Sequence, residues 1–93
     1  MAVKRLAITV TGRVQGVGFR YFAKDAADSL GITGWVRNNF ERAVECEAQG
    51  KGEDLENFVS RLREGPPMSN VKDVAVNEIP VVDGAEYGFE ITF

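Results

Sequence analysis

The chain has 93 residues, 44% hydrophobic and 27% charged, and its 11 Lys and Arg against 14 Asp and Glu give a formal net charge of −3. This length and composition predict one globular domain that buries about 65% of the surface exposed by the unfolded chain. The sequence has no histidine and one cysteine, Cys46. Catalytic relays that use histidine, zinc sites made of histidine or of four cysteines, and an internal disulfide are therefore excluded.

The first residues do not predict a targeting or membrane segment. The apolar run at 6–10 follows Lys4 and Arg5 and is too short for a signal peptide or a membrane span. A single unpaired cysteine fits a reducing compartment. We therefore expect a cytoplasmic protein with no membrane partner.

Charge is distributed unevenly along the chain. Residues 1–24 carry five bases and no acid, whereas residues 25–93 carry six bases and all 14 acids, so that +5 and −8 sum to −3. The negative total disfavours binding to nucleic acid. The basic first quarter either presents one positive site to a small anion or scatters its charges over opposite faces of a strand and a helix, and charge alone leaves both possibilities open.

Hydrophobic periodicity predicts strands and helices throughout the chain. Apolar residues alternate in the strands and recur at i, i+3, i+4 and i+7 in the helices. In chain order we expect a strand at 3–11, a helix at 20–30, strands at 32–38 and 43–48, a helix at 53–64, and strands at 71–79 and 87–93. The order is β-α-β-β-α-β with one additional C-terminal strand.

Glycine and proline mark the predicted boundaries of these elements. Gly12 is expected to end the first strand, and Gly31 occupies the position that follows a helix end. Gly-Lys-Gly at 50–52 should turn the chain into the second helix, and Gly-Pro-Pro at 65–67 should stop that helix. A short hairpin is expected at 39–42, from Asn39 to Arg42.

Two βαβ-type halves joined by a short hairpin indicate a split βαβ arrangement. The predicted fold is an α+β, ferredoxin-like sandwich, with a mainly antiparallel sheet, two helices on one face and an additional C-terminal strand. We expect a single domain over residues 1–93. Trp35 is predicted to lie in the core, and Cys46 is predicted to be a small core residue.

The segment 12–20, Gly-Arg-Val-Gln-Gly-Val-Gly-Phe-Arg, lies between the first strand and the first helix. Gly16 and Gly18 let the backbone curl so that N–H groups point into one concavity, and the helix start adds its own N–H groups and positive dipole end. Arg20 adds a planar fork of donors suited to phosphate. These residues predict an anion cradle, although a tight turn without a ligand is an alternative for the loop alone.

The spacing of this loop separates it from two common phosphate motifs. A Walker loop would need Lys at position 18, and a dinucleotide fingerprint would need Gly at position 21. The sequence satisfies neither requirement.

The segment 12–20, followed by Gly-Trp-Val-Arg-Asn at 34–38, resembles the two signature blocks of the acylphosphatases. The resemblance implies a small ferredoxin-like enzyme that hydrolyses the carboxyl-phosphate anhydride of acyl phosphates to a carboxylate and inorganic phosphate. It implies Arg20 as the essential phosphate ligand and Asn38 as the residue that positions the attacking water, whereas an Asn at a strand end is otherwise a turn or cap residue. The implied backbone phosphate ligands are Gln15, Gly16, Val17, Gly18, Phe19 and Arg20.

The chain departs from the family pattern in the hairpin. Family members often have Asp-Gly where this chain has Glu41-Arg42. We therefore expect a different turn geometry or a longer loop there.

Acyl phosphate hydrolysis suits a chain with so few reactive side chains. A carboxylate leaves without protonation, phosphoryl transfer relies on positioning and electrostatics, and a substrate phosphate oxygen can accept the proton from water. We therefore expect no metal, no cofactor and no protein base. The expected partners are a small-molecule acyl phosphate and inorganic phosphate as product and inhibitor, and the enzyme is expected to be a monomer.

Other functions of this fold compete with hydrolysis. A nucleic-acid-binding module is disfavoured because the strand at 43–48 has no aromatic residue and the net charge is negative. A metal chaperone would need a second cysteine beside Cys46. A non-hydrolytic module that binds phosphate or carbamoyl phosphate and acts with a larger enzyme remains the alternative.

Overall fold

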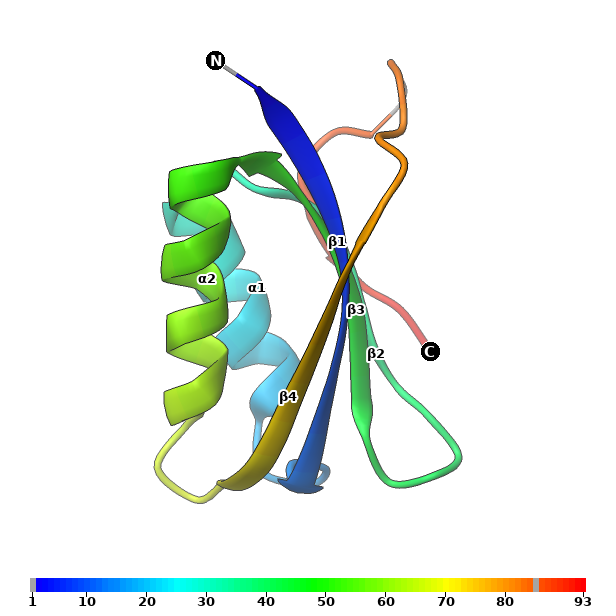
Figure 1. Ribbon diagram of the computed structural model, residues 1–93. Helices are drawn as coiled ribbons and strands as arrows, with labels where there is room; N and C mark the ends of the chain where they lie inside the picture. The colour runs from blue at the N-terminus through cyan, green and yellow to red at the C-terminus, as the bar shows by residue number, and fades with distance from the viewer. Residues whose placement is uncertain (1, 85) are drawn as a thin grey trace.

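The computed structural model describes residues 2–84 and 86–93, which form a five-stranded sheet and two helices (Figure 1). In chain order the elements are β1 (Val3–Arg13), α1 (Phe19–Ser29), β2 (Thr33–Asn38), β3 (Val44–Lys51), α2 (Gly52–Glu64), β4 (Asn70–Ile79) and β5 (Phe89–Ile91). Their order confirms the predicted βαββαβ pattern with an added C-terminal strand. No helix in the described part of the chain is long and apolar enough to cross a membrane.

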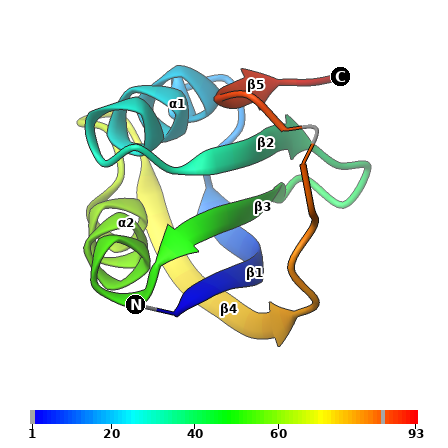
Figure 2. The same cartoon turned by 90° about the horizontal axis from the view of Figure 1, so that it is seen from above.

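The sheet has the strand order β4-β1-β3-β2-β5. β1 pairs antiparallel with β3 and with β4, β2 pairs antiparallel with β3, and β5 runs parallel to its neighbour β2. Both helices cover one face of the sheet, and the connection from β4 to β5 crosses on the other side (Figures 1 and 2). The predicted α+β, ferredoxin-like sandwich is therefore confirmed.

The core lies between the two helices and the covered face of the sheet. The Phe58 ring of α2 meets the Phe89 ring of β5 edge to face, with centroids 5.7 Å apart. Cys46 is buried in this core as predicted, and burial raises the pKa of its thiol, which keeps it protonated and unreactive. The largest fully buried side chains are Phe19, Phe58, Phe89, Ile8, Ile32, Leu55, Leu62, Val10, Val14, Val36 and Val44.

The prediction that Gly12 ends the first strand is wrong. β1 continues to Arg13, and its register with β4 shifts between Thr11 and Gly12. Gly12 has a φ of 118°, and a Cβ at this position would collide with the Asn70 carbonyl oxygen. The glycine therefore forms a bulge inside a continuing strand, and such a bulge bends the strand that leads into the following loop.

The predicted Gly-Lys-Gly turn also belongs to regular structure. Gly50 and Lys51 pair with β1 as the last residues of β3, and α2 begins directly at Gly52. The two predicted helix ends are confirmed, because α1 and α2 end just before Gly31 and Gly65, which have φ values of 67° and 68°.

Trp35 does not lie in the core, contrary to the prediction. Val36 points toward the helices and is fully buried, so its neighbours Trp35 and Arg37 point to the opposite, open face of the sheet. Trp35 is half-buried there, and the Arg37 guanidinium carbon lies 4.9 Å from the centroid of its ring. The large indole predicted a buried side chain, but the alternation of side chains along β2 directs Trp35 to the open face of the sheet.

The final strand is shorter than the predicted 87–93. Phe89 is buried, but Tyr87 and Phe93 are 89% and 98% exposed, and pairing with β2 is confined to Phe89–Ile91. The alternation of Tyr87, Phe89, Ile91 and Phe93 therefore extends past the paired segment at both ends.

A buried arginine fastens the β4–β5 connection to the open face of the sheet. Arg5 of β1 is 3% exposed, and it donates hydrogen bonds to one Glu47 oxygen at 2.9 Å and to both Glu86 oxygens at 2.8 and 3.0 Å. The hydrogen bonds from Arg5 hold the pKa of Glu86 below its usual range, and those to Glu86 and Glu47 raise the pKa of Arg5. The Gln49 side chain exchanges two further hydrogen bonds with the backbone of Val82, at 2.9 and 3.0 Å. No local sequence pattern predicts this cluster, because Arg5 and Glu86 lie 81 residues apart.

Candidate active site

Two connecting segments meet at one end of the sheet: the loop 14–18 between β1 and α1, and the hairpin 39–43 between β2 and β3 (Figure 1). Arg20 is the second residue of α1, and Asn38 is the last residue of β2. Both line one cavity of about 170 Å³, and its other lining residues are Val14, Gly16, Gly18, Phe19 and Tyr21. The fold therefore brings together the two side chains singled out from the sequence.

The loop before α1 has a run of unused backbone donors. Gly16 and Gly18 adopt φ values of 75° and 77°. From Gln15 to Tyr21, no backbone N–H donates a hydrogen bond to a residue that the structure describes, and the first helical bond runs from the Phe22 N–H to the Gly18 carbonyl at 3.0 Å. The first turn of α1 contains no acid. Free N–H groups and the positive end of the helix dipole favour an anion at this place.

The predicted backbone ligands are the N–H groups of residues 15–20, and four of these residues line the cavity. Gly16, Gly18, Phe19 and Arg20 line it. Val17 packs against the core, and the side chain of Gln15 is directed to the hairpin. The concave part of the loop therefore centres on the two glycines and the helix start.

The guanidinium group of Arg20 is available for an anion. Within the described part of the chain, no carboxylate oxygen lies within 4.0 Å of it. Its central carbon lies 5.1 Å from the centroid of the Phe93 ring, so one face of the group rests on an aromatic surface. This stacking leaves the N–H donors at the edge of the group free for bidentate contact with phosphate.

Asn38 and Asn39 are neighbours with different environments. Asn39 Oδ1 accepts hydrogen bonds from the backbone N–H groups of Glu41 and Ala43, both at 2.9 Å, and its Nδ2 donates to Glu45 at 3.0 Å. The side-chain amide of Asn38 makes no hydrogen bond to any described residue. The turn-forming role expected of an asparagine here belongs to Asn39, and the Asn38 amide is left free beside the cavity.

The hairpin itself contains an unusual backbone conformation. Arg42 has a φ of 65° and is the only residue other than glycine with a positive φ in the described chain. The hairpin closes through the Asn39 N–H, which donates to the Ala43 carbonyl at 2.9 Å. Hydrogen bonds from Asn39 and Arg37 hold the pKa of Glu45 below its usual range, so this carboxylate stays ionised beside the turn.

Gln15 connects the loop to the hairpin, a role that the sequence did not suggest. Its Nε2 donates hydrogen bonds to the backbone carbonyls of Asn39 and Ala43, both at 2.9 Å. These partners lie 24 and 28 residues away in the sequence. No local pattern marks such a contact, because it depends on how the sheet brings the two segments together.

The basic residues of the first quarter do not form one positive site. Arg5 is buried against acids on the open face, and Lys24 pairs with Asp28 at 3.1 Å and donates to the Phe89 carbonyl at 2.8 Å. Of the five, Arg20 lines the cavity. Of the two possibilities that the charge distribution left open, the scattering of the five basic side chains is the correct one. The positive character of the site comes from one guanidinium and the backbone N–H groups.

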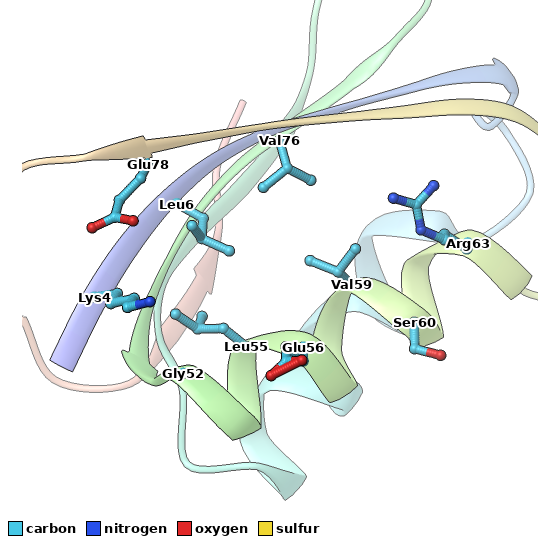
Figure 3. A pocket seen from close by; sticks show the side chains of 10 residues that line it. All are labelled: Lys4, Leu6, Gly52, Leu55, Glu56, Val59, Ser60, Arg63, Val76 and Glu78. Atoms are coloured by element: carbon cyan, nitrogen blue, oxygen red, sulfur yellow. The ribbon is translucent and has the colours of Figure 1, made fainter. Parts of the chain in front are cut away.

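Two cavities about three times as large differ from this one in chemistry. A cavity of about 530 Å³ lies between α2 and the strands β1 and β4, where Leu6, Val59 and Val76 point toward one another and Lys4 and Glu78 stand at the rim (Figure 3). It shares no lining residue with the Arg20 cavity. A cavity of about 560 Å³ also borders Asn38, and its lining includes the exposed rings of Phe40 and Phe93. Among the described residues, no three His, Cys, Asp or Glu side chains gather as metal ligands.

Comparison with known proteins finds one family over nearly the whole chain. The acylphosphatase family model matches residues 6–91. The acylphosphatase of Bifidobacterium longum is 46% identical over 87 residues, which cover 94% of this chain and 90% of the relative. The crystal structure of acylphosphatase from Bacillus subtilis matches with a TM-score of 0.92 at 40% identity, covering 97% of this chain and 99% of the other. Full-length HypF in its phosphate- and nucleotide-bound form matches with a TM-score of 0.90 at 30% identity, covering 99% of this chain and 12% of HypF.

Proposed function

This chain belongs to the acylphosphatase family, whose members hydrolyse acyl phosphates, and we propose that it does so by metal-independent, in-line attack of water. In this proposal the loop from Gln15 to Arg20 holds the phosphate and Asn38 orients the water. The supporting observation is that a guanidinium, a side-chain amide and a run of backbone N–H groups, all without a partner among the described residues, lie at one cavity.

Phosphate binding rests on charge and on fixed donors. The N–H groups around Gly16 and Gly18 are already oriented by the positive φ values of the glycines, so binding an anion needs little rearrangement. Arg20 supplies the cation and contacts two phosphate oxygens through its fork. Because these donors are held in place before the reaction, they also stabilise the charge of the transition state.

The attacking water is held by Asn38. The side-chain oxygen accepts a hydrogen bond from one O–H of the water, which points a lone pair at the phosphorus, and the carboxylate of the substrate leaves on the opposite side. The second water proton passes to a phosphate oxygen of the substrate as the P–O bond to the carboxylate breaks. The electron pair of that bond departs with the carboxylate, so the step needs neither a protein acid nor a protein base.

Turnover of benzoyl phosphate by the purified chain tests this mechanism. We expect hydrolysis that EDTA does not reduce, because no metal takes part. Asn38→Ala should lower kcat by about 100-fold, and the inhibition constant of inorganic phosphate should stay within about two-fold, since the amide contacts water and not the anion.

Asn57→Ala, at an exposed position on α2, is the matched control and should leave both constants unchanged. Wild-type turnover by Asn38→Ala would contradict the role of water positioning. Loss of activity with EDTA, restored by a divalent metal, would contradict metal independence.

The likeness to a region of HypF favours one other candidate function. That region makes up 12% of a longer chain in a phosphate- and nucleotide-bound protein, so this fold also occurs as a part of a larger one. This chain could then bind an acyl or carbamoyl phosphate and act with a larger enzyme. Binding of phosphate without turnover of any acyl phosphate would support this module over the hydrolase.

We also propose that the enzyme acts as a cytoplasmic monomer on a small-molecule substrate and not on nucleic acid. The open face of β3 presents Glu45 and Glu47 and no aromatic residue, which is unsuited to a polyanion. Light scattering coupled to gel filtration tests the monomer, and a mass of twice 10.2 kDa would contradict it.

A further inference from the structure

Gln15 spans the gap between the phosphate loop and the hairpin with both of its N–H donors. The carboxamide nitrogen lies 2.9 Å from the carbonyl oxygen of Asn39 and 2.9 Å from that of Ala43. A primary amide has two N–H bonds, so these two contacts use its full donor capacity. The Gln15 backbone N–H meanwhile has no acceptor among the described residues and stays available to the loop.

The two carbonyl groups mark the place where the hairpin closes. The Ala43 carbonyl also accepts the Asn39 N–H at 2.9 Å, and Asn39 follows Asn38 directly. Gln15 therefore holds the hairpin one residue away from the amide that orients the water. A small movement of this hairpin would shift Asn38 relative to the loop, and misplacement by about 1 Å can cost two orders of magnitude in rate.

We propose that Gln15 is a positioning residue, whose side chain sets the separation between the phosphate-binding loop and Asn38. This inference rests on the proposed function of the same site. The sheet already joins β1 to β3 through the pairing of Val10 with Val44, so the fold does not depend on Gln15 alone. The two hydrogen bonds from the Gln15 side chain, here called the Gln15 clamp, add a direct link between the residues that hold the anion and the residue that holds the water.

A double-mutant cycle separates positioning from a merely structural role. Gln15→Met keeps the length of the side chain and removes its donors, and it should lower kcat about 10-fold while the inhibition constant of phosphate stays within about two-fold. In an Asn38→Ala background the same substitution should change kcat less than two-fold, because no correctly held water is left to misplace.

Gln49→Met is the matched control. Gln49 also bridges to a backbone carbonyl, that of Val82, but on the part of the sheet that lies against the β4–β5 connection. The Gln49→Met variant should have a lower melting temperature than the wild type and an unchanged kcat. Gln15→Asn, which keeps an amide one methylene shorter, serves as the second variant, and it should show the same non-additivity with Asn38→Ala if Gln15→Met does not fold.

Unchanged kcat in the folded Gln15 variants would overturn the inference. So would equal losses in the wild-type and Asn38→Ala backgrounds, or a rise in the phosphate inhibition constant that matches the loss of kcat, since either would mean that Gln15 acts on the loop itself. Absence of turnover in the unmodified chain would overturn the proposed function and this inference together, whereas an additive cycle overturns the inference alone.

Discussion

Arg20 differs from Arg5 and Arg37 in what surrounds its guanidinium group. Arg5 is neutralised by Glu47 and Glu86, and Arg37 pairs with a carboxylate at 3.1 Å. Arg20 has no acid within reach among the described residues and lines a cavity. The same contrast separates Asn38 from its neighbour in the hairpin. At the scale of single residues, the side chains proposed as functional are those that line a cavity and have no hydrogen-bond or ion-pair partner among the described residues.

Replacing this cation should abolish phosphate binding and catalysis. Arg20→Gln removes the side-chain charge at the cavity, and we expect kcat/KM for benzoyl phosphate to fall by about 10³-fold or more, with inhibition by inorganic phosphate lost. Arg13→Gln, at an exposed position of β1, is the control and should retain activity. Inhibition of the Arg20 variant by phosphate at the wild-type concentration would show that the backbone donors suffice.

At the scale of elements, the hairpin between β2 and β3 fixes the position of Asn38, the residue directly before it. It is stabilised by the Asn39 side chain, by the Gln15 amide and by the ionised Glu45. Arg42 opposes these contacts, because its left-handed backbone conformation is unfavourable for a residue with a Cβ. The sequence predicted an altered turn at this place, and its backbone strain is concentrated at Arg42.

Relieving this strain should stabilise the protein. Arg42→Gly removes the Cβ that disfavours the left-handed conformation, so we expect the free energy of unfolding to rise by about 1 kcal/mol, measured by urea denaturation. Arg42→Ala removes the same long side chain but keeps the Cβ, and it should not be stabilising. Equal stability of the two variants would mean that the conformation of Arg42 carries no strain.

At the scale of the whole molecule, the connection from β4 to β5 packs against the sheet face that the helices leave open. Arg5 and Gln49 hold this connection through Glu86 and Val82, which lie 81 and 33 residues from their partners. The connection leads into β5, which pairs with β2 beside the site. The ionic cluster around Arg5 therefore joins the inner strands β1 and β3 to this connection.

Acid should weaken this closure. The pKa of Glu86 is lowered in the folded protein, so its stabilising contribution is present above the unfolded value near 4.5 and is lost as the pH falls through the lower folded value. Glu86→Gln should reduce the free energy of unfolding at pH 7 by about 1 to 3 kcal/mol. Its stability should then decline less steeply than that of the wild type below pH 4.5. Glu78→Gln, an exposed acid of β4, should follow the wild-type profile.

The sequence by itself determined the order of the elements and the fold class, and it singled out the segment that contains the candidate site, because these depend on local periodicity, glycine positions and a compact motif. It could not place Trp35, which alternation sends to the open face, or reveal the buried charge of Arg5. The tertiary structure decided these, together with the Gln15 clamp, since each depends on partners tens of residues away. It also decided that the early positive charges scatter, because a strand and a helix direct neighbouring side chains to opposite faces.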